Sequence, residues 1–169
     1  AKMLGDLAAV AKLGVTPQNF IYHGGRPEPD EIREWASQCL KAGADLFYWY
    51  IENADTLMNM WEGNLEVLAI NKQLRTLPKL KLPETTSTAI LHSDYDRWAN
   101  MDNVLHAAYS LHAILGEQVK AWFKFISPTG LALGTHNLDD YKVVYVPRMK
   151  FTDPETTAKI MSFVNNGGT

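Results

Sequence analysis

Residues 29–51 read PDEIREWASQCLKAGADLFYWYI, which places a helix and a strand in direct succession. Pro29 and the two acids after it are typical of a helix start, because proline suits the first turn and acids favour the positive end of the helix dipole. One apolar stripe follows, made of Ile32, Trp35, Ala36, Cys39 and Leu40. Gly43 ends the helix. The aromatic run at 46–51 predicts a strand buried on both faces, as in a parallel sheet.

The segments on either side extend this pattern to a βαβ unit. We expect a short amphipathic helix over residues 3–13, ended by Gly14, and then a strand over residues 19–22. A further helix over residues 61–77 follows the aromatic run, and Pro78 forbids its continuation.

The alternation of strand and helix resumes after a linker at residues 78–87, which contain two prolines, two lysines and three Ser/Thr residues. Strands are expected over 88–92, 121–126 and 141–147, a helix over 103–115, and a final helix that begins with a capping box of Thr152 and Glu155 and ends at Gly167. We therefore divide the chain into residues 1–77, a linker at 78–87 and a second domain at 88–169.

Both expected sheets have few strands. The first series supplies two and the second three, whereas a doubly wound sheet normally has five or more. Exposed parallel edges are rarely left bare. The pattern indicates a segment of a longer polypeptide, or a chain that completes its sheets with partners.

Composition excludes several classes of partner. The 169 residues carry a net charge of −3 with scattered basic residues, so we expect neither a nucleic-acid nor a membrane partner. No apolar run approaches the ~20 residues that span a bilayer. A single cysteine, Cys39, excludes an internal disulfide; it suits the cytoplasm and also many exported proteins. His106 and His112 lie about 240° apart on their helix, so we predict no metal site.

Several short motifs resemble family 42 glycoside hydrolases, the β-galactosidase family. Residues 18–20 (QNF), 23–27 (HGGRP), 29–35 (PDEIREW) and 42–45 (AGAD), with Gln38, are similar to the loop after strand seven, helix seven and strand eight of that family's barrel. Residues 138–147 (LDDYKVVYVP) and 163–169 (FVNNGGT) look like its flavodoxin-like trimerisation domain. The two blocks occur in the family's order.

This resemblance implies an α/β fold made of the last βα units of a (β/α)8 barrel followed by a partial flavodoxin-like parallel sheet. It also implies an oligosaccharide or β-galactoside substrate, a homotrimer, no cofactor, and retaining hydrolysis by two glutamates about 5 Å apart. The chain departs from the family in having no glutamate before Glu28. The catalytic residues are therefore unknown, and we expect the chain alone to be inactive.

Four residues are candidate sugar contacts. His23 and Arg26 lie on a glycine-containing loop at the expected barrel mouth, where they could bind sugar hydroxyls or simply be solvated turn residues. Trp49 and Glu52 lie at a strand end, and an aromatic ring with a carboxylate is a common way to hold a pyranose. Equally, Trp49 could be core and Glu52 a helix-start anion.

The second domain shows no recognisable ligand chemistry. Asp94 and Asp96 follow its first strand, where doubly wound folds place ligands, but the loop has no glycine and its two acids would repel phosphate. Cys39 lies mid-helix on an apolar face, which favours packing over nucleophilic chemistry. Two alternatives to a glycosidase therefore stay open: a non-catalytic flavodoxin-like interaction module, and a small-molecule-binding α/β domain.

Overall fold

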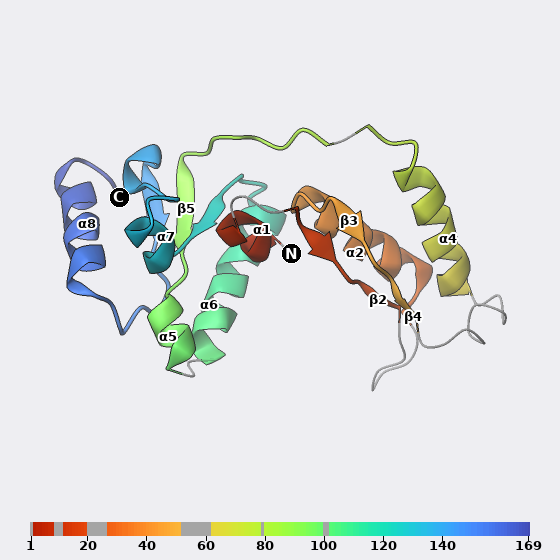
Figure 1. Cartoon of the computed structure of the whole chain (residues 1–169), viewed down its shortest axis with the longest axis horizontal. Helices are drawn as coiled ribbons and strands as arrows, with labels where there is room; N and C mark the ends of the chain where they lie inside the picture. Colours follow the sequence, from red (N-terminus) through yellow and green to blue (C-terminus); the bar gives the residue numbers. More distant parts are fainter. Residues whose placement is uncertain (1, 9–11, 20–26, 52–61, 79, 100–101) are drawn as a thin grey trace. The chain divides into compact units, whose positions relative to one another are not determined.

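The computed structural model describes residues 2–8, 12–19, 27–51, 62–78, 80–99 and 102–169. The chain divides into two compact units, Ala1–Gly5 with Val10–Leu82 (unit 1) and Asp6–Ala9 with Pro83–Thr169 (unit 2). Both contain helices and parallel strands (Figure 1). The expected mixed α/β fold with parallel sheets is confirmed.

Unit 1 is built on a parallel βαβ connection. Its elements are β1 (Gly14–Val15), β2 (Gln18–Asn19), α2 (Pro29–Lys41), β3 (Leu46–Phe47), β4 (Tyr50–Ile51) and α4 (Glu62–Leu74), with α1 (Lys2–Ala8) shared between the units. β1 pairs with β3 and β2 with β4, both in parallel, with Gly14 opposite Leu46 and Gln18 opposite Tyr50. Helix α2 is the crossover between them.

Helix α2 begins where the sequence predicts and packs on α4. Glu28 and Glu31 form a capping box, and the Glu28 N–H donates to Glu31 Oε2 over 2.9 Å. The core of unit 1 contains Ile32 and Ala36 of α2 with Val67 and Ile70 of α4. Burial of these side chains, rather than helix propensity, supplies most of the stability of such helices.

Two expectations for unit 1 are wrong. The first helix is described over Lys2–Ala8, residues 9–11 lie outside the described part, and Lys12 and Leu13 of the expected helix are not helical. Gly14 begins β1, because the Leu13 carbonyl accepts from the Asp45 and Leu46 N–H groups and so holds the backbone in the sheet. The run at 46–51 is two short strands with one exposed face, on which Leu46 is 42%, Tyr48 60% and Tyr50 50% exposed.

Two other boundaries differ in unit 1. Strand β2 begins at Gln18, and residues 20–22 of the expected strand lie outside the described part. Helix α4 ends at Leu74 rather than 77, and residues 75–77 form a turn in which the Thr76 N–H and hydroxyl both donate to the Gln73 carbonyl.

Unit 2 contains a three-stranded parallel sheet in the order β6-β5-β7. Its elements are β5 (Thr88–Leu91), α5 (Asp94–Trp98), α6 (Asp102–His112), the π-helix η1 (Ala113–Gln118), β6 (Lys124–Ile126), α7 (Pro128–Ala132), the 3-10 helix η2 (Leu138–Asp140), β7 (Val143–Tyr145) and α8 (Pro154–Asn165). The first strand is central, with the second and third on either side. The strands expected at 121–126 and 141–147 are shorter than predicted.

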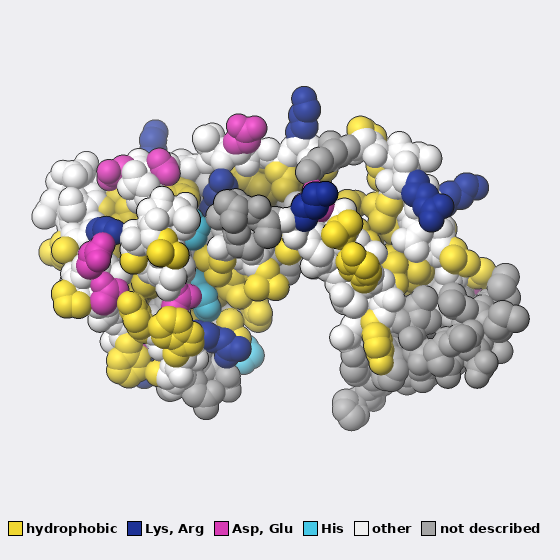
Figure 2. All heavy atoms as spheres, viewed as in Figure 1, with side chains coloured by type: hydrophobic (Ala, Val, Ile, Leu, Met, Phe, Trp, Pro, Cys, Tyr) yellow, Lys and Arg dark blue, Asp and Glu magenta, His cyan; other side chains and the backbone are white. Residues whose placement is uncertain are grey.

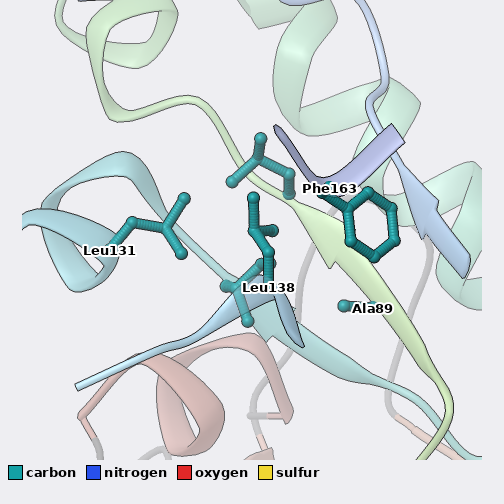
Figure 3. Packing of buried hydrophobic residues seen from close by; sticks show 6 residues of the cluster. Ala89, Leu131, Leu138 and Phe163 are labelled. Atoms are coloured by element: carbon teal, nitrogen blue, oxygen red, sulfur yellow. The ribbon is translucent and has the colours of Figure 1, made fainter. Parts of the chain in front are cut away.

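Both faces of this sheet are covered. Ala89 and Leu91 of β5 pack with Leu131, Leu138 and Phe163 on one face (Figure 3). Side chains alternate along a strand, so Ile90 and its register partner Phe125 lie on the other face, and both are buried. There the His112 ring of α6 stacks on Phe125 with the centroids 6.4 Å apart.

Thr169 pairs with the outer edge of β7. Its N–H donates to the Lys142 carbonyl over 2.9 Å, and its carbonyl accepts from Val144 over 2.8 Å. Thr169 therefore bonds to the residues before and after Val143, which is the hydrogen-bond pattern of parallel strands. It does so on the edge of β7 opposite to the edge that pairs with β5.

The cap of helix α8 is Asp153 rather than the expected Thr152. Its carboxylate accepts from the Thr156 N–H over 2.7 Å and from the Thr156 hydroxyl over 2.6 Å. These bonds lower the pKa of Asp153 to about 2, from 3.8. The carboxylate can therefore hold both bonds throughout the neutral range.

We expect Asp153→Ala to cost about 1 kcal/mol at neutral pH, as is usual for a lost N-cap. Because the folded pKa lies below the unfolded one, the stabilisation is complete above about pH 4 and is lost as the pH falls towards 2. Urea unfolding of the wild type and the variant at neutral and acidic pH measures this. A stability difference that stays constant down to pH 2 would contradict it.

Candidate functional site

Trp49 is the described member of the four candidate sugar contacts, since His23, Arg26 and Glu52 lie outside the described residues. Its indole is half-buried and packs against the α2–α4 core. The Nε1–H donates to Asn71 Oδ1 over 3.1 Å, and the Phe47 ring lies 6.2 Å away. These contacts give Trp49 a packing role, and its sugar-binding role stays a prediction.

We expect Trp49→Phe to destabilise unit 1 by about 1 kcal/mol, because the Asn71 carbonyl loses its donor while most of the apolar contact remains. Urea unfolding measures this cost. The control is Tyr48→Phe, which changes an exposed ring on the opposite face and is expected to lie within about 0.5 kcal/mol of wild type. Equal effects of the two substitutions would contradict the packing role.

The opposite face of the same strands carries two exposed tyrosines, Tyr48 and Tyr50, and Gln18 is the register partner of Tyr50. Phenol rings on an exposed sheet face can stack on a sugar and bind its hydroxyls. This exposed face was not predicted, because the run at 46–51 was expected to be buried on both sides. The spacing of Tyr48 and Tyr50, which are two residues apart, does indicate that their side chains share one face.

In unit 2, the carboxyl ends of β5 and β7 are the place where doubly wound sheets bind ligands. Asp96 lies there and is fully buried. Its carboxylate accepts from the backbone N–H groups of Lys150, at 3.1 and 3.0 Å, and Phe151, at 3.2 Å. The Ser93 hydroxyl donates to Asp96 Oδ2 over 2.6 Å. Asp94 accepts from the Thr129 N–H over 3.2 Å.

His92 lies at the same end of β5 and is buried. Its Nδ1 has no hydrogen-bond partner among the described residues. Burial lowers the pKa of His92, an effect that Asp94 partly opposes. The ring is therefore neutral at pH 7 and is not a cation that could offset the buried Asp96.

A polar pocket of about 480 Å³ lies elsewhere in unit 2. It is lined by Leu131, Gly134, His136, Asn137, Leu138, Asp139, Lys159 and Ser162. The Lys159 ammonium lies 2.7 Å from the Leu131 carbonyl and 2.8 Å from Glu155 Oε1. His136 Nδ1 accepts from the Ser127 N–H over 3.3 Å. The Lys159 ammonium and His136 Nδ1 are thus already paired within the protein.

Other chemistries find no support in the described part of the chain. Burial raises the pKa of the Cys39 thiol, so it is protonated near neutral pH and suits packing rather than nucleophilic attack. Among the described residues, no group of three His, Cys, Asp or Glu side chains could hold a metal ion. No described helix combines the length and apolar character that a membrane span requires.

Comparison with known structures shows a similar fold in one enzyme. The chain is similar to α-L-fucosidase isoenzyme 2 from Paenibacillus thiaminolyticus, with a TM-score of 0.63 and 15% identity over 99% of this chain and 26% of that one. It thus spans about a quarter of that enzyme's length. No curated protein sequence matches it.

The second half of the chain matches a known family. Residues 86–169 match the β-galactosidase trimerisation domain of glycoside hydrolase family 42. The resemblance seen in the sequence is confirmed.

Proposed function

We propose that this chain is part of a retaining glycoside hydrolase that acts on β-galactosides or related oligosaccharides. In this proposal residues 1–77 form the last βα units of a (β/α)8 barrel, 78–87 a linker and 88–169 a flavodoxin-like trimerisation domain. The observation that carries it is the family match of residues 86–169. The order β6-β5-β7 supports the flavodoxin-like assignment, since such sheets begin 2-1-3.

The burial pattern of unit 1 supports the barrel assignment. Barrel strands are parallel, with helices on the outer face and side chains packed on the inner one. Phe47 and Trp49 contact the helix core, whereas Tyr48 and Tyr50 are on the face without helices. We assign this second face to the barrel interior, with Tyr50 near its mouth. His23, Arg26, Trp49 and Glu52 remain proposed substrate contacts, although this assignment places the Trp49 ring on the helix side of the strands rather than in the barrel interior.

Assembly is the proposed role of unit 2. Hydrophobic side chains reach its surface near α5 (Figure 2), where Trp98 is 72% exposed, and Phe151 is also exposed. Exposed aromatic residues of this kind are typical of protein interfaces. We expect sedimentation equilibrium of the full chain to give three times its 19.0 kDa mass. A species that stays monomeric at all concentrations would contradict the trimer.

The chain alone is expected to show no turnover of a chromogenic β-galactoside, because its described residues supply no identified pair of glutamates about 5 Å apart. Robust hydrolysis by the purified chain would overturn this expectation. The enzyme proposal itself is tested by the coding sequence upstream of residue 1. It should encode the earlier barrel strands with a glutamate after strand four.

A non-catalytic interaction module is the second candidate. It is favoured by the crevice of unit 2, where Asp96 is already bonded within the protein. Absence of the upstream glutamate after strand four would support this module. Its presence, with hydrolysis by the longer polypeptide, would support the enzyme.

A further inference from the structure

The loop after β7 and the start of α5 are joined by one buried carboxylate. Asp96 lies on α5, and its acceptor bonds reach the N–H groups of Lys150 and Phe151, more than fifty residues further along the chain. Ser93 completes the set, because its hydroxyl donates to Asp96 Oδ2 and accepts from the Asp96 N–H over 3.1 Å. Three donors therefore converge on one carboxylate.

Hydrogen-bond donors that converge in this way are typical of an anion-binding site. Consecutive backbone N–H groups that point at one position bind phosphates and carboxylates in many loops. Here the backbone turns sharply just before these groups, since Arg148 has a φ of 49°. Asp96 is fully buried and Ser93 is buried beside it, so these donors converge on a carboxylate that solvent does not reach.

We propose that the Asp96 carboxylate is the permanent internal occupant of an anion cradle formed by the Ser93 hydroxyl and the N–H groups of Lys150 and Phe151. The cradle takes a small monocarboxylate, such as acetate, once the side chain is removed. Asp96 thereby closes the crevice in which related sheets bind ligands and fixes the loop that carries Phe151. This inference is independent of the glycosidase proposal.

The test uses the full chain with Asp96→Ala. Loss of the bonds from these three donors is expected to lower the Tm by on the order of 10 °C. Sodium acetate, compared with sodium chloride at equal ionic strength, is expected to raise the Tm of the variant and to leave that of the wild type unchanged, because only the variant has an empty cradle. A variant that melts like the wild type, or shows no acetate-specific shift, would overturn the proposal.

The matched control is Asp94→Ala, which removes the same charge from the same helix but only one bond, to the Thr129 N–H. We expect a smaller loss of Tm and no acetate effect. An acetate effect equal to that of Asp96→Ala would show non-specific anion binding and reject the cradle.

If Asp96→Ala does not fold, hydrogen exchange of the wild type tests the proposal instead. Lys150 and Phe151 amide protons should be strongly protected, and exchange at the rate of an open loop would refute the proposal.

Discussion

Replacing Phe125 with alanine is expected to lower the unfolding free energy of unit 2 by about 3–5 kcal/mol, the usual cost of truncating a buried aromatic residue. Phe125 is 1% exposed on β6. Its ring lies 5.6 Å from Phe123 in an edge-to-face arrangement and is stacked on His112. Truncation leaves a cavity between the sheet and α6 that neighbouring strands cannot close without losing their register.

Urea unfolding followed by circular dichroism measures this loss. Leu133→Ala is the control, since its side chain is 73% exposed and its truncation is expected to change stability by no more than about 0.5 kcal/mol. Comparable costs for the two substitutions would mean that the face of the sheet opposite the Leu131–Phe163 core is not a packed core.

Elements with strong local signals could be predicted from the sequence. Helix α2 begins at Pro29 because proline, the following acids and an apolar stripe all indicate the same helix. Strand β5 was similarly clear, as an apolar run bounded by a linker and a polar loop. For both α2 and β5, the residues that determine the secondary structure lie within the helix or strand itself or directly beside it.

Features that depend on distant neighbours could not be predicted. Whether the run at 46–51 is buried on one face or two is set by what packs on it, and among the described residues the helix core contacts one face while the other is exposed. The π-helix at 113–118 has no sequence signature that distinguishes it from the end of α6. At α8, Thr152 and Asp153 are both capable caps, and side-chain geometry selects Asp153.

The candidate sites follow the same rule. The position of Asp94 and Asp96 after the first strand indicated a ligand-binding edge. What Asp96 contacts there could not be predicted, because its partners at Lys150 and Phe151 belong to a loop that only the fold brings close. The sequence thus indicated the edge of the sheet, whereas the hydrogen bonds of Asp96 are known only from the structure.

Gly130→Ala is the second prediction with a large effect, and its sign opposes helix propensity. Gly130 lies inside α7, where alanine would ordinarily stabilise a helix by about 0.5–1 kcal/mol. Its position in this structure, however, places an added Cβ against the His136 ring, in direct conflict with Nδ1 and 2.6 Å from Cε1. Moving His136 breaks the bond that it accepts from the Ser127 N–H. We therefore expect a net loss of about 1–3 kcal/mol.

Gly116→Ala is the matched control, because the added Cβ lies 3.5 Å from the nearest atom, Cε1 of Phe123, which is an ordinary contact. It is expected to be neutral or slightly stabilising. The double variant Gly130→Ala/His136→Ala separates steric conflict from backbone effects: the cost of the Gly130 substitution should largely disappear in the His136→Ala background. If that cost is unchanged there, the conflict with the imidazole is not its cause, since a purely steric penalty requires the ring to be present.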